Sequence, residues 1–255
     1  PYITPYCVVQ VSHGMCEYMD RYEPFASFMT ANGIAVCGND HLGHGYTARQ
    51  SQDFGYFSDK DGRRFAVTDR KPMNSKIREY FPDLPIVMLG HSMGSFFARK
   101  YVTKWPHTVD GLILSGTGGP NKLVDFGIWA ANLVAKVRGP RYRSPTVHKL
   151  AFGHYLKKID DPITNYDWIS RDEDVVEEYA TDPYCTFMFT ANGFHELFSA
   201  LRDVSGPGWA RLVRRNMPIL MIQGDADPVG DYSQGTRIVR NWLLRAGVSN
   251  VEYKV

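Results

Sequence analysis

The stretch IVMLGHSMG, residues 86–94, carries the strongest fold signal in the chain, and its last five residues fit the pattern G-x-S-x-G. The apolar run at 86–89 predicts a strand before the pattern, and the periodicity after it predicts a helix at 95–104. A strand, a tight turn and a helix form a nucleophile elbow, whose glycines permit a strained turn that lifts the serine oxygen clear of the sheet. Ser92 is therefore a candidate nucleophile. The alternative is a small-residue turn in which the serine is incidental.

Short apolar runs alternate with helical patterns on both sides of this stretch. They predict strands at residues 7–12, 34–39, 86–89, 111–115, 219–223 and 251–255, and helices at 22–31, 63–80, 95–104 and 232–246. This alternation is typical of an α/β fold with a mainly parallel sheet flanked by helices. The interval from 116 to 218 is about a hundred residues, too long for an ordinary loop. We therefore expect a core of residues 1–116 and 218–255, interrupted by an inserted subdomain at 117–217.

Two backbone amides are candidates for an oxyanion hole. Met15 follows the first predicted strand in the sequence His13-Gly14-Met15, and Met93 follows the candidate nucleophile. An N–H from each of these places can hold the oxygen that becomes negative when a serine attacks a carbonyl. Taken alone, the pair His13-Gly14 is also a common turn.

A carboxylate can reach the same sheet edge from the strand predicted at 219–223, because parallel strands end on one side of a sheet. The sequence after that strand is GDADPV, residues 224–229, and it holds two acids. Asp227 is the favoured acid for orienting a catalytic imidazole. Asp225 is the alternative, as a turn former that bonds its own loop.

Four ordered motifs resemble those of one known family. They are HGMCEY at 13–18, DHLGHG at 40–45, GHSMG at 90–94 and GDADP at 224–228. Together they resemble the monoacylglycerol lipase and lysophospholipase branch of the α/β-hydrolases, which is related to the serine aminopeptidases. YDWISRD at 166–172 resembles the cap of the bacterial members. The resemblance runs from about residue 8 to the end, and it implies an α/β-hydrolase fold in which the insertion is a helical cap over an acyl site.

The resemblance also implies a catalytic triad of serine, aspartate and histidine, in that chain order. None of the eight histidines follows Asp227. The family's catalytic histidine is therefore expected just beyond Val255, after the strand that begins at Val251. Because the family's first strands are expected ahead of Pro1, we expect a sequence that is partial at both ends. A serine without its base is a poor nucleophile, so residues 1–255 alone should retain little activity.

Composition argues against several other classes of function. Lys and Arg number 29 against 27 Asp and Glu, and the net charge of +2 is too small to indicate nucleic-acid binding. The four cysteines are widely spaced and His41 and His44 lack further ligands at suitable spacing, so we expect neither a disulfide framework nor a metal site. No apolar run reaches the roughly 18 residues of a membrane span. We expect a cytoplasmic protein whose reaction needs no cofactor.

The inserted segment has an apolar part and a basic part. Residues 123–135 are apolar nearly all round, so a helix there needs cover on two sides or a ligand on one. An acyl chain would suit Phe126, Ile128, Trp129, Leu133 and Val134, which favours a lipid ester such as a monoacylglycerol or a lysophospholipid as the substrate. The basic half is a candidate for weak contact with an anionic lipid surface, or is simply a solvated face. It contains Lys136, Arg138, Arg141, Arg143, Lys149, Lys157 and Lys158.

Two other functions remain open at this point. In an aminopeptidase-type hydrolase, acids such as Asp172, Glu173 or Asp174 would hold the free amine of a substrate. In a protein from a different class, the hydrolase fold would bind a ligand without catalysis. A superfold alone does not decide between them.

Overall fold

The computed structural model describes residues 4–255 and places six strands in one sheet. They are β1 (Cys7–Ser12), β2 (Ile34–Gly38), β3 (Ile86–His91), β4 (Gly111–Ser115), β5 (Ile219–Ile222) and β6 (Val251–Lys254). All neighbouring strands run parallel, in the order β2-β1-β3-β4-β5-β6. The predicted parallel α/β sheet is therefore confirmed, and every strand end lies within two residues of its predicted position.

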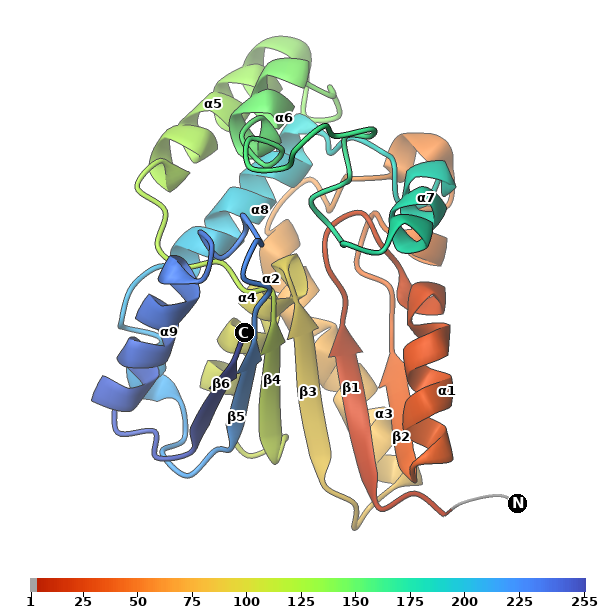
Figure 1. The fold of residues 1–255 in the computed structure, drawn as a ribbon, viewed down its shortest axis with the longest axis vertical. Coiled ribbons are helices and arrows are strands. Elements are labelled where there is room, and N and C mark those ends of the chain that lie inside the picture. Colours follow the sequence, from red (N-terminus) through yellow and green to blue (C-terminus); the bar gives the residue numbers. More distant parts are fainter. Residues whose placement is uncertain (1–3) are drawn as a thin grey trace.

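The register of the strands brings their carboxyl ends to one edge of the sheet (Figure 1). Ser12 of β1 pairs with Gly90 of β3, and His91 pairs with Ser115 of β4. Ser115 pairs in turn with Ile222 of β5. The loops after β1, β3 and β5 therefore leave the sheet at neighbouring points, where parallel-sheet proteins build their binding sites.

Helices flank the sheet, and one of them differs from its prediction. α1 (Glu23–Ala31) packs on β2, α4 (Met93–Lys104) on β3, and α9 (Gln234–Arg245) on β6. The single helix predicted at 63–80 is wrong, because the structure has α2 (Gly62–Thr68) and α3 (Arg70–Tyr80) instead. Pro72 is the cause. It has no N–H to donate to Thr68, and its ring would clash with the Thr68 carbonyl if one helix ran through.

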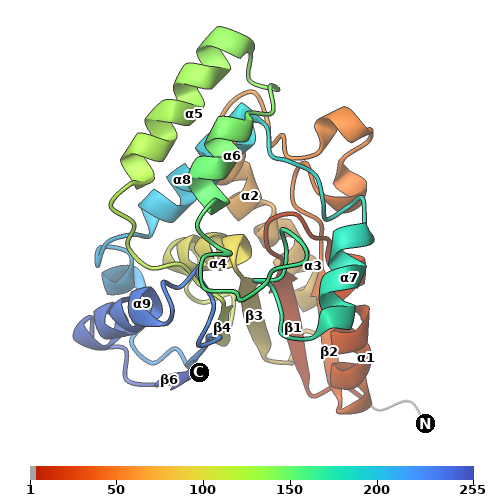
Figure 2. The ribbon, with the colours of Figure 1, turned by 45° about the horizontal axis from the view of Figure 1, so that its top comes forward.

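Four helices lie between β4 and β5 in the chain. They are α5 (Val124–Arg138), α6 (Pro145–Phe152), α7 (Glu173–Thr181) and α8 (Ala191–Asp203). α5 and α6 lie beyond the carboxyl edge of the sheet, while α7 stands apart from them, near α1 and the loop after β1 (Figures 1 and 2). α8 packs on both α5 and α4, so it joins the inserted segment to the core. None of the helices in residues 4–255 has both the length and the apolar character needed to cross a membrane.

Three histidines form a buried cluster beside the carboxyl end of β1. The exposed fractions of His13, His41 and His44 are 0%, 1% and 0%. The ring centroids of His13 and His41 are 3.9 Å apart, and the His41 N–H donates to Nε2 of His13 at 2.9 Å. The buried guanidinium of Arg70 bonds Nδ1 of His41. Burial lowers the pKa of all three imidazoles, that of His44 to about 4, so all three are neutral at pH 7.

We expect this cluster to make the fold labile to acid between about pH 6.5 and pH 4. In this range the unfolded chain binds protons on these imidazoles and the folded chain does not, so stability is lost as the pH falls. His44 alone should account for about 3 kcal/mol of the free energy of unfolding, at about 1.4 kcal/mol per unit of pKa. Urea unfolding at several pH values measures this loss.

A matched pair of variants isolates the effect of His44. Its ring contacts Phe57, Phe187 and Phe189, so His44→Phe should fit the same surroundings and lose less stability in acid than the native protein. His107 is exposed, and His107→Gln should leave the pH dependence unchanged. An equal loss in acid for His44→Phe and the native protein would contradict the prediction.

Candidate active site

Ser92 occupies a sharp turn between β3 and α4. Its φ of +47° and ψ of −119° lie in a region that residues other than glycine rarely adopt. The Ser92 N–H donates to the carbonyl of Ser115 on β4 at 2.9 Å, which ties the turn to the sheet. α4 begins at the next residue, Met93. The structure thus contains the strand, strained turn and helix that the motif predicts.

Two glycines flank the turn because the surrounding chain leaves no room for a side chain. A Cβ atom at Gly94 would overlap the carbonyl oxygens of Ser12 and His13 at the end of β1. A Cβ atom at Gly90 would lie 2.7 Å from Cα of Ser95 and 2.8 Å from Cβ of Ala98, both on α4. The two glycines of G-x-S-x-G are therefore required because α4 packs so closely against β1 and β3.

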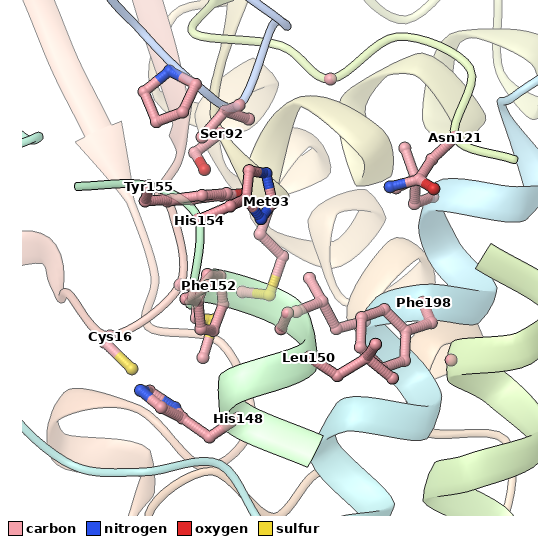
Figure 3. A pocket seen from close by; sticks show the side chains of 18 of the residues that line it. Cys16, Ser92, Met93, Asn121, His148, Leu150, Phe152, His154, Tyr155 and Phe198 are labelled. Atoms are coloured by element: carbon pink, nitrogen blue, oxygen red, sulfur yellow. The ribbon is translucent and has the colours of Figure 1, made fainter. Parts of the chain in front are cut away.

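The two candidate oxyanion donors share a cavity with Ser92. Met15, in the loop after β1, and Met93 line the same cavity as the serine. Figure 3 shows Ser92 and Met93 facing His154 and Tyr155, which come from the inserted segment. Within residues 4–255 neither amide donates a hydrogen bond to another group of the protein. Two such amides can stabilise the oxyanion of a carbonyl group bound between them.

Asp227 and Asp225 have very different surroundings. The Asp227 carboxylate accepts hydrogen bonds from the Val229 N–H at 2.8 Å and from Nε2 of Gln223 at 2.7 Å. Burial raises its pKa, and the two hydrogen bonds act in the opposite direction. The Asp225 side chain is 64% exposed and pairs with Arg171 at 2.8 Å. Of the two acids, Asp227 has the fixed, partly desolvated carboxylate that can orient an imidazole.

Gln223 is part of this arrangement, although sequence reasoning did not identify it. The side chain is buried at the end of β5, and its Oε1 accepts a hydrogen bond from Oγ1 of Thr236 on α9 at 2.8 Å. This bond fixes the amide so that its NH₂ group faces Asp227. No motif marks such a glutamine, because its role depends on a threonine 13 residues later in the chain.

A cavity of about 740 Å³ opens beside Ser92, and most of its wall comes from the inserted segment. Its composition is mostly apolar. Within the described part of the chain, Asp231 is the one acid and Lys122 the one lysine or arginine in the lining. Apolar and aromatic lining residues include Trp168 and Phe187, together with Leu150, Phe152, Tyr155 and Phe198 (Figure 3). A cavity of this size and composition suits an uncharged ligand with an acyl chain.

The apolar helix predicted at 123–135 is α5, but it has cover on one side only. Val124, Ile128 and Ala131 are buried, and the helix packs on α8. Phe126, Trp129 and Leu133 are 52%, 58% and 46% exposed. The expected acyl contacts through Phe126, Ile128, Trp129, Leu133 and Val134 are wrong, since the cavity lining from this segment is Leu123, Val124 and Gly127. An apolar periodicity does not reveal which face of a helix meets a cavity.

No histidine in residues 4–255 forms a hydrogen bond with Ser92 or Asp227. His148 and His154 line the cavity. His91 contacts Oγ of Ser115 at 3.4 Å and a carboxylate oxygen of Glu17 at 3.8 Å, away from the serine that follows it.

Within residues 4–255, no three His, Cys, Asp or Glu side chains are grouped as metal ligands. The four cysteines are free thiols: Cys7, Cys16, Cys37 and Cys185.

Comparisons with known proteins extend over nearly the whole chain. The family model Hydrolase_4, described as serine aminopeptidase S33, matches residues 4–255. A crystal structure of a thermostable carboxyl esterase from Bacillus coagulans in complex with glycerol is 33% identical, with a TM-score of 0.92 over 100% of this chain and 82% of the esterase. Monoacylglycerol lipase from Mycolicibacterium smegmatis is 29% identical over 89% of this chain and 72% of the lipase. A phospholipase of Bacillus subtilis is 25% identical over 98% of this chain and 85% of the phospholipase.

Proposed function

Because the chain belongs to the Hydrolase_4 family of serine aminopeptidase S33 type, we propose that it hydrolyses carboxylic esters of lipids through an acyl-enzyme on Ser92. The observation that carries the proposal is the strained turn that holds Ser92 at the wall of an apolar cavity of about 740 Å³. The relatives named as carboxyl esterase, monoacylglycerol lipase and phospholipase support a lipid ester as substrate. A monoacylglycerol or a lysophospholipid is the substrate class we favour.

In the proposed reaction, Oγ of Ser92 attacks the ester carbonyl and a histidine accepts its proton. The N–H groups of Met15 and Met93 hold the oxyanion. The histidine then protonates the leaving alcohol, Asp227 orients the imidazole, and water releases the acid from the acyl-enzyme. We expect this histidine at the carboxyl edge of the sheet, where the loop after β5 carries Asp227.

We further propose that residues 117–217 act as a cap on a core of residues 1–116 and 218–255. The position of α5 and α6 beyond the sheet edge supports this division (Figure 2). Two arginines hold the segment to the core. Arg141 pairs with Asp53 at 2.9 Å, and Arg143 donates to the carbonyl groups of Ser51 and Phe54 at 3.1 and 2.9 Å.

We also propose that the cap makes contact with an anionic lipid surface. Only some of the lysines and arginines in its basic half are available for this contact. Arg141 and Arg143 are engaged within the protein, whereas Lys136, Arg138, Lys149 and Lys157 make no ion pair within residues 4–255. The exposed Phe126 and Trp129 lie on the same segment. Co-sedimentation with anionic vesicles at rising salt tests this contact.

We propose a cytoplasmic location for the protein, because its four free cysteines suit a reducing compartment.

The proposal predicts a strong preference for esters over aminoacyl anilides. The carboxylate of Asp172 caps α7 by accepting from the Asp174 N–H at 3.1 Å, and neither of these acids nor Glu173 lines the cavity. Asp231 is the one acid in the described cavity lining, and the three acids of the aminopeptidase alternative lie outside it. We therefore expect kcat/KM for p-nitrophenyl octanoate to exceed that for leucine p-nitroanilide by at least about 10³-fold. Spectrophotometric assays of the released chromophores measure both. Asp172→Asn should leave the ratio unchanged, and a preference for the anilide would favour the aminopeptidase alternative instead.

A further inference from the structure

The loop that carries Met15 is hydrogen bonded to the inserted segment. The Tyr179 hydroxyl, on α7, donates to the carbonyl of Cys16 at 2.8 Å. The Cys16 thiol donates to the carbonyl of Phe187 at 3.2 Å. The Tyr18 hydroxyl donates to the carboxylate of Asp182, the residue after α7, at 2.9 Å. These bonds match the position of α7 beside the loop after β1 (Figure 1).

A second set of contacts links residues within the same loop, and one of these residues also contacts Tyr179. The carboxylate of Glu17 accepts from the Gly14 N–H, which fixes the start of the turn. It also lies 3.5 Å from the guanidinium of Arg21. That guanidinium lies 4.9 Å from the centroid of the Tyr179 ring. Tyr179 therefore contacts this loop in two places. Its hydroxyl donates to the carbonyl of Cys16, and its ring packs against the guanidinium of Arg21, which pairs with Glu17.

The turn needs this support because one of its residues adopts an unfavourable backbone conformation. Cys16 has a φ of +53°, in the left-handed region that glycine adopts easily and other residues rarely do. Tyr179 is 8% exposed, and burial raises the pKa of its phenol, so the hydroxyl stays protonated and remains a donor. Without this bond, the strained peptide next to Met15 would be free to relax.

We propose that Tyr179 is a positioning residue for the oxyanion hole: by holding the carbonyl of Cys16, it keeps the N–H of Met15 directed at the oxyanion formed on attack by Ser92. The inference rests on the proposed function. It assigns the cap a part in the rate of the reaction as well as in the choice of substrate, because α7 belongs to the inserted segment and Met15 to the core.

Tyr179→Phe tests the inference, since it removes one hydroxyl and keeps the ring. For p-nitrophenyl octanoate we expect kcat to fall roughly 10-fold, because the donor is misplaced and not lost, with KM changed less than about twofold. The affinity for a trifluoromethyl ketone, which forms an oxyanion when Ser92 adds to it, should fall by a similar factor. Tyr184→Phe is the control for removal of a phenol hydroxyl from the same segment, since the Tyr184 hydroxyl makes no hydrogen bond within residues 4–255. Tyr179 lines the cavity and Tyr184 does not, so an effect of lost substrate contact in Tyr179→Phe would appear as a change in KM.

Hydrogen exchange provides a readout that does not depend on turnover. Amides in a peptide covering residues 12–18 should exchange faster in Tyr179→Phe than in the native protein, and at the native rate in Tyr184→Phe. An unchanged kcat in Tyr179→Phe, or a loss confined to KM, would overturn the inference while leaving ester hydrolysis intact. If the native protein hydrolyses no ester, the proposed function fails on its own, and native exchange rates in Tyr179→Phe would separately overturn the inference.

Discussion

Replacing Ser92 with alanine is expected to lower kcat for ester hydrolysis by at least about 10⁴-fold, because no other group can form the acyl-enzyme. KM and thermal stability should change little, since within residues 4–255 the Ser92 hydroxyl has no hydrogen bond to lose. Intact-mass spectrometry after treatment with a fluorophosphonate should show one adduct on the native protein and none on Ser92→Ala. A native protein that takes up no adduct and hydrolyses no ester would favour the ligand-binding alternative.

The same assay distinguishes the two candidate acids. Asp227→Asn should lower kcat by about 10³ to 10⁴-fold, because the amide favours the wrong tautomer of the imidazole. Asp225→Asn should reduce it less than about twofold, since Asp225 is exposed and paired with Arg171. Equal losses in the two variants, or a larger loss in Asp225→Asn, would show that Asp227 is not the orienting acid.

Gly94→Ala is expected to damage both stability and activity. The new Cβ atom would overlap the carbonyl oxygens of Ser12 and His13, which are backbone atoms of β1 and the loop after it and cannot swing away like a side chain. We expect a loss of at least about 3 kcal/mol in the free energy of unfolding, at the upper end for overpacked sites. The shift of α4 should also displace Ser92 and Met93 and lower kcat by about 10²-fold. Urea unfolding and the ester assay measure the two effects.

Gly208→Ala is the matched control for this substitution. A Cβ atom at Gly208 would meet no heavy atom within 4 Å, so the variant should stay within about 0.5 kcal/mol of the native protein. If Gly94→Ala were as stable and as active as Gly208→Ala, the close approach of α4 to β1 could not be the reason for glycine at position 94.

Local patterns were sufficient to predict the parallel α/β sheet, and the resemblance of four motifs implied the α/β-hydrolase fold. The structure and its relatives confirm both. Strands β1 to β5 are short apolar runs with clear ends, whereas β6 alternates apolar and charged residues. The pattern G-x-S-x-G placed Ser92 between a strand and a helix that are both present. Met15, Ser92 and Met93 do line one cavity, because parallel strands deliver their loops to one edge. The catalytic roles of these residues and of Asp227 remain predictions.

Features that depend on distant contacts were not predictable in the same way. The break between α2 and α3 has a local cause, Pro72, but the helical periodicity at 63–80 continues across it and predicts a single helix. The faces of α5 could not be assigned without α8. Nothing in the sequence around Arg141 indicates its ion pair with Asp53, which lies 88 residues earlier in the chain. Likewise, the bond from Tyr179 to Cys16 joins residues 163 positions apart, and no motif covers that separation.

The insertion between β4 and β5 also bears on the order in which the site can assemble. β3 and β4, on either side of the Ser92 turn and α4, are near neighbours in sequence and can pair early. Pairing β4 with β5 requires closure of a loop of about a hundred residues, with an entropic cost of roughly 4 kcal/mol before any contact offsets it. We therefore expect Asp227 to reach the site late in folding, after the serine turn has formed. During refolding, recovery of activity would report the completed chain topology, not the appearance of helices and strands.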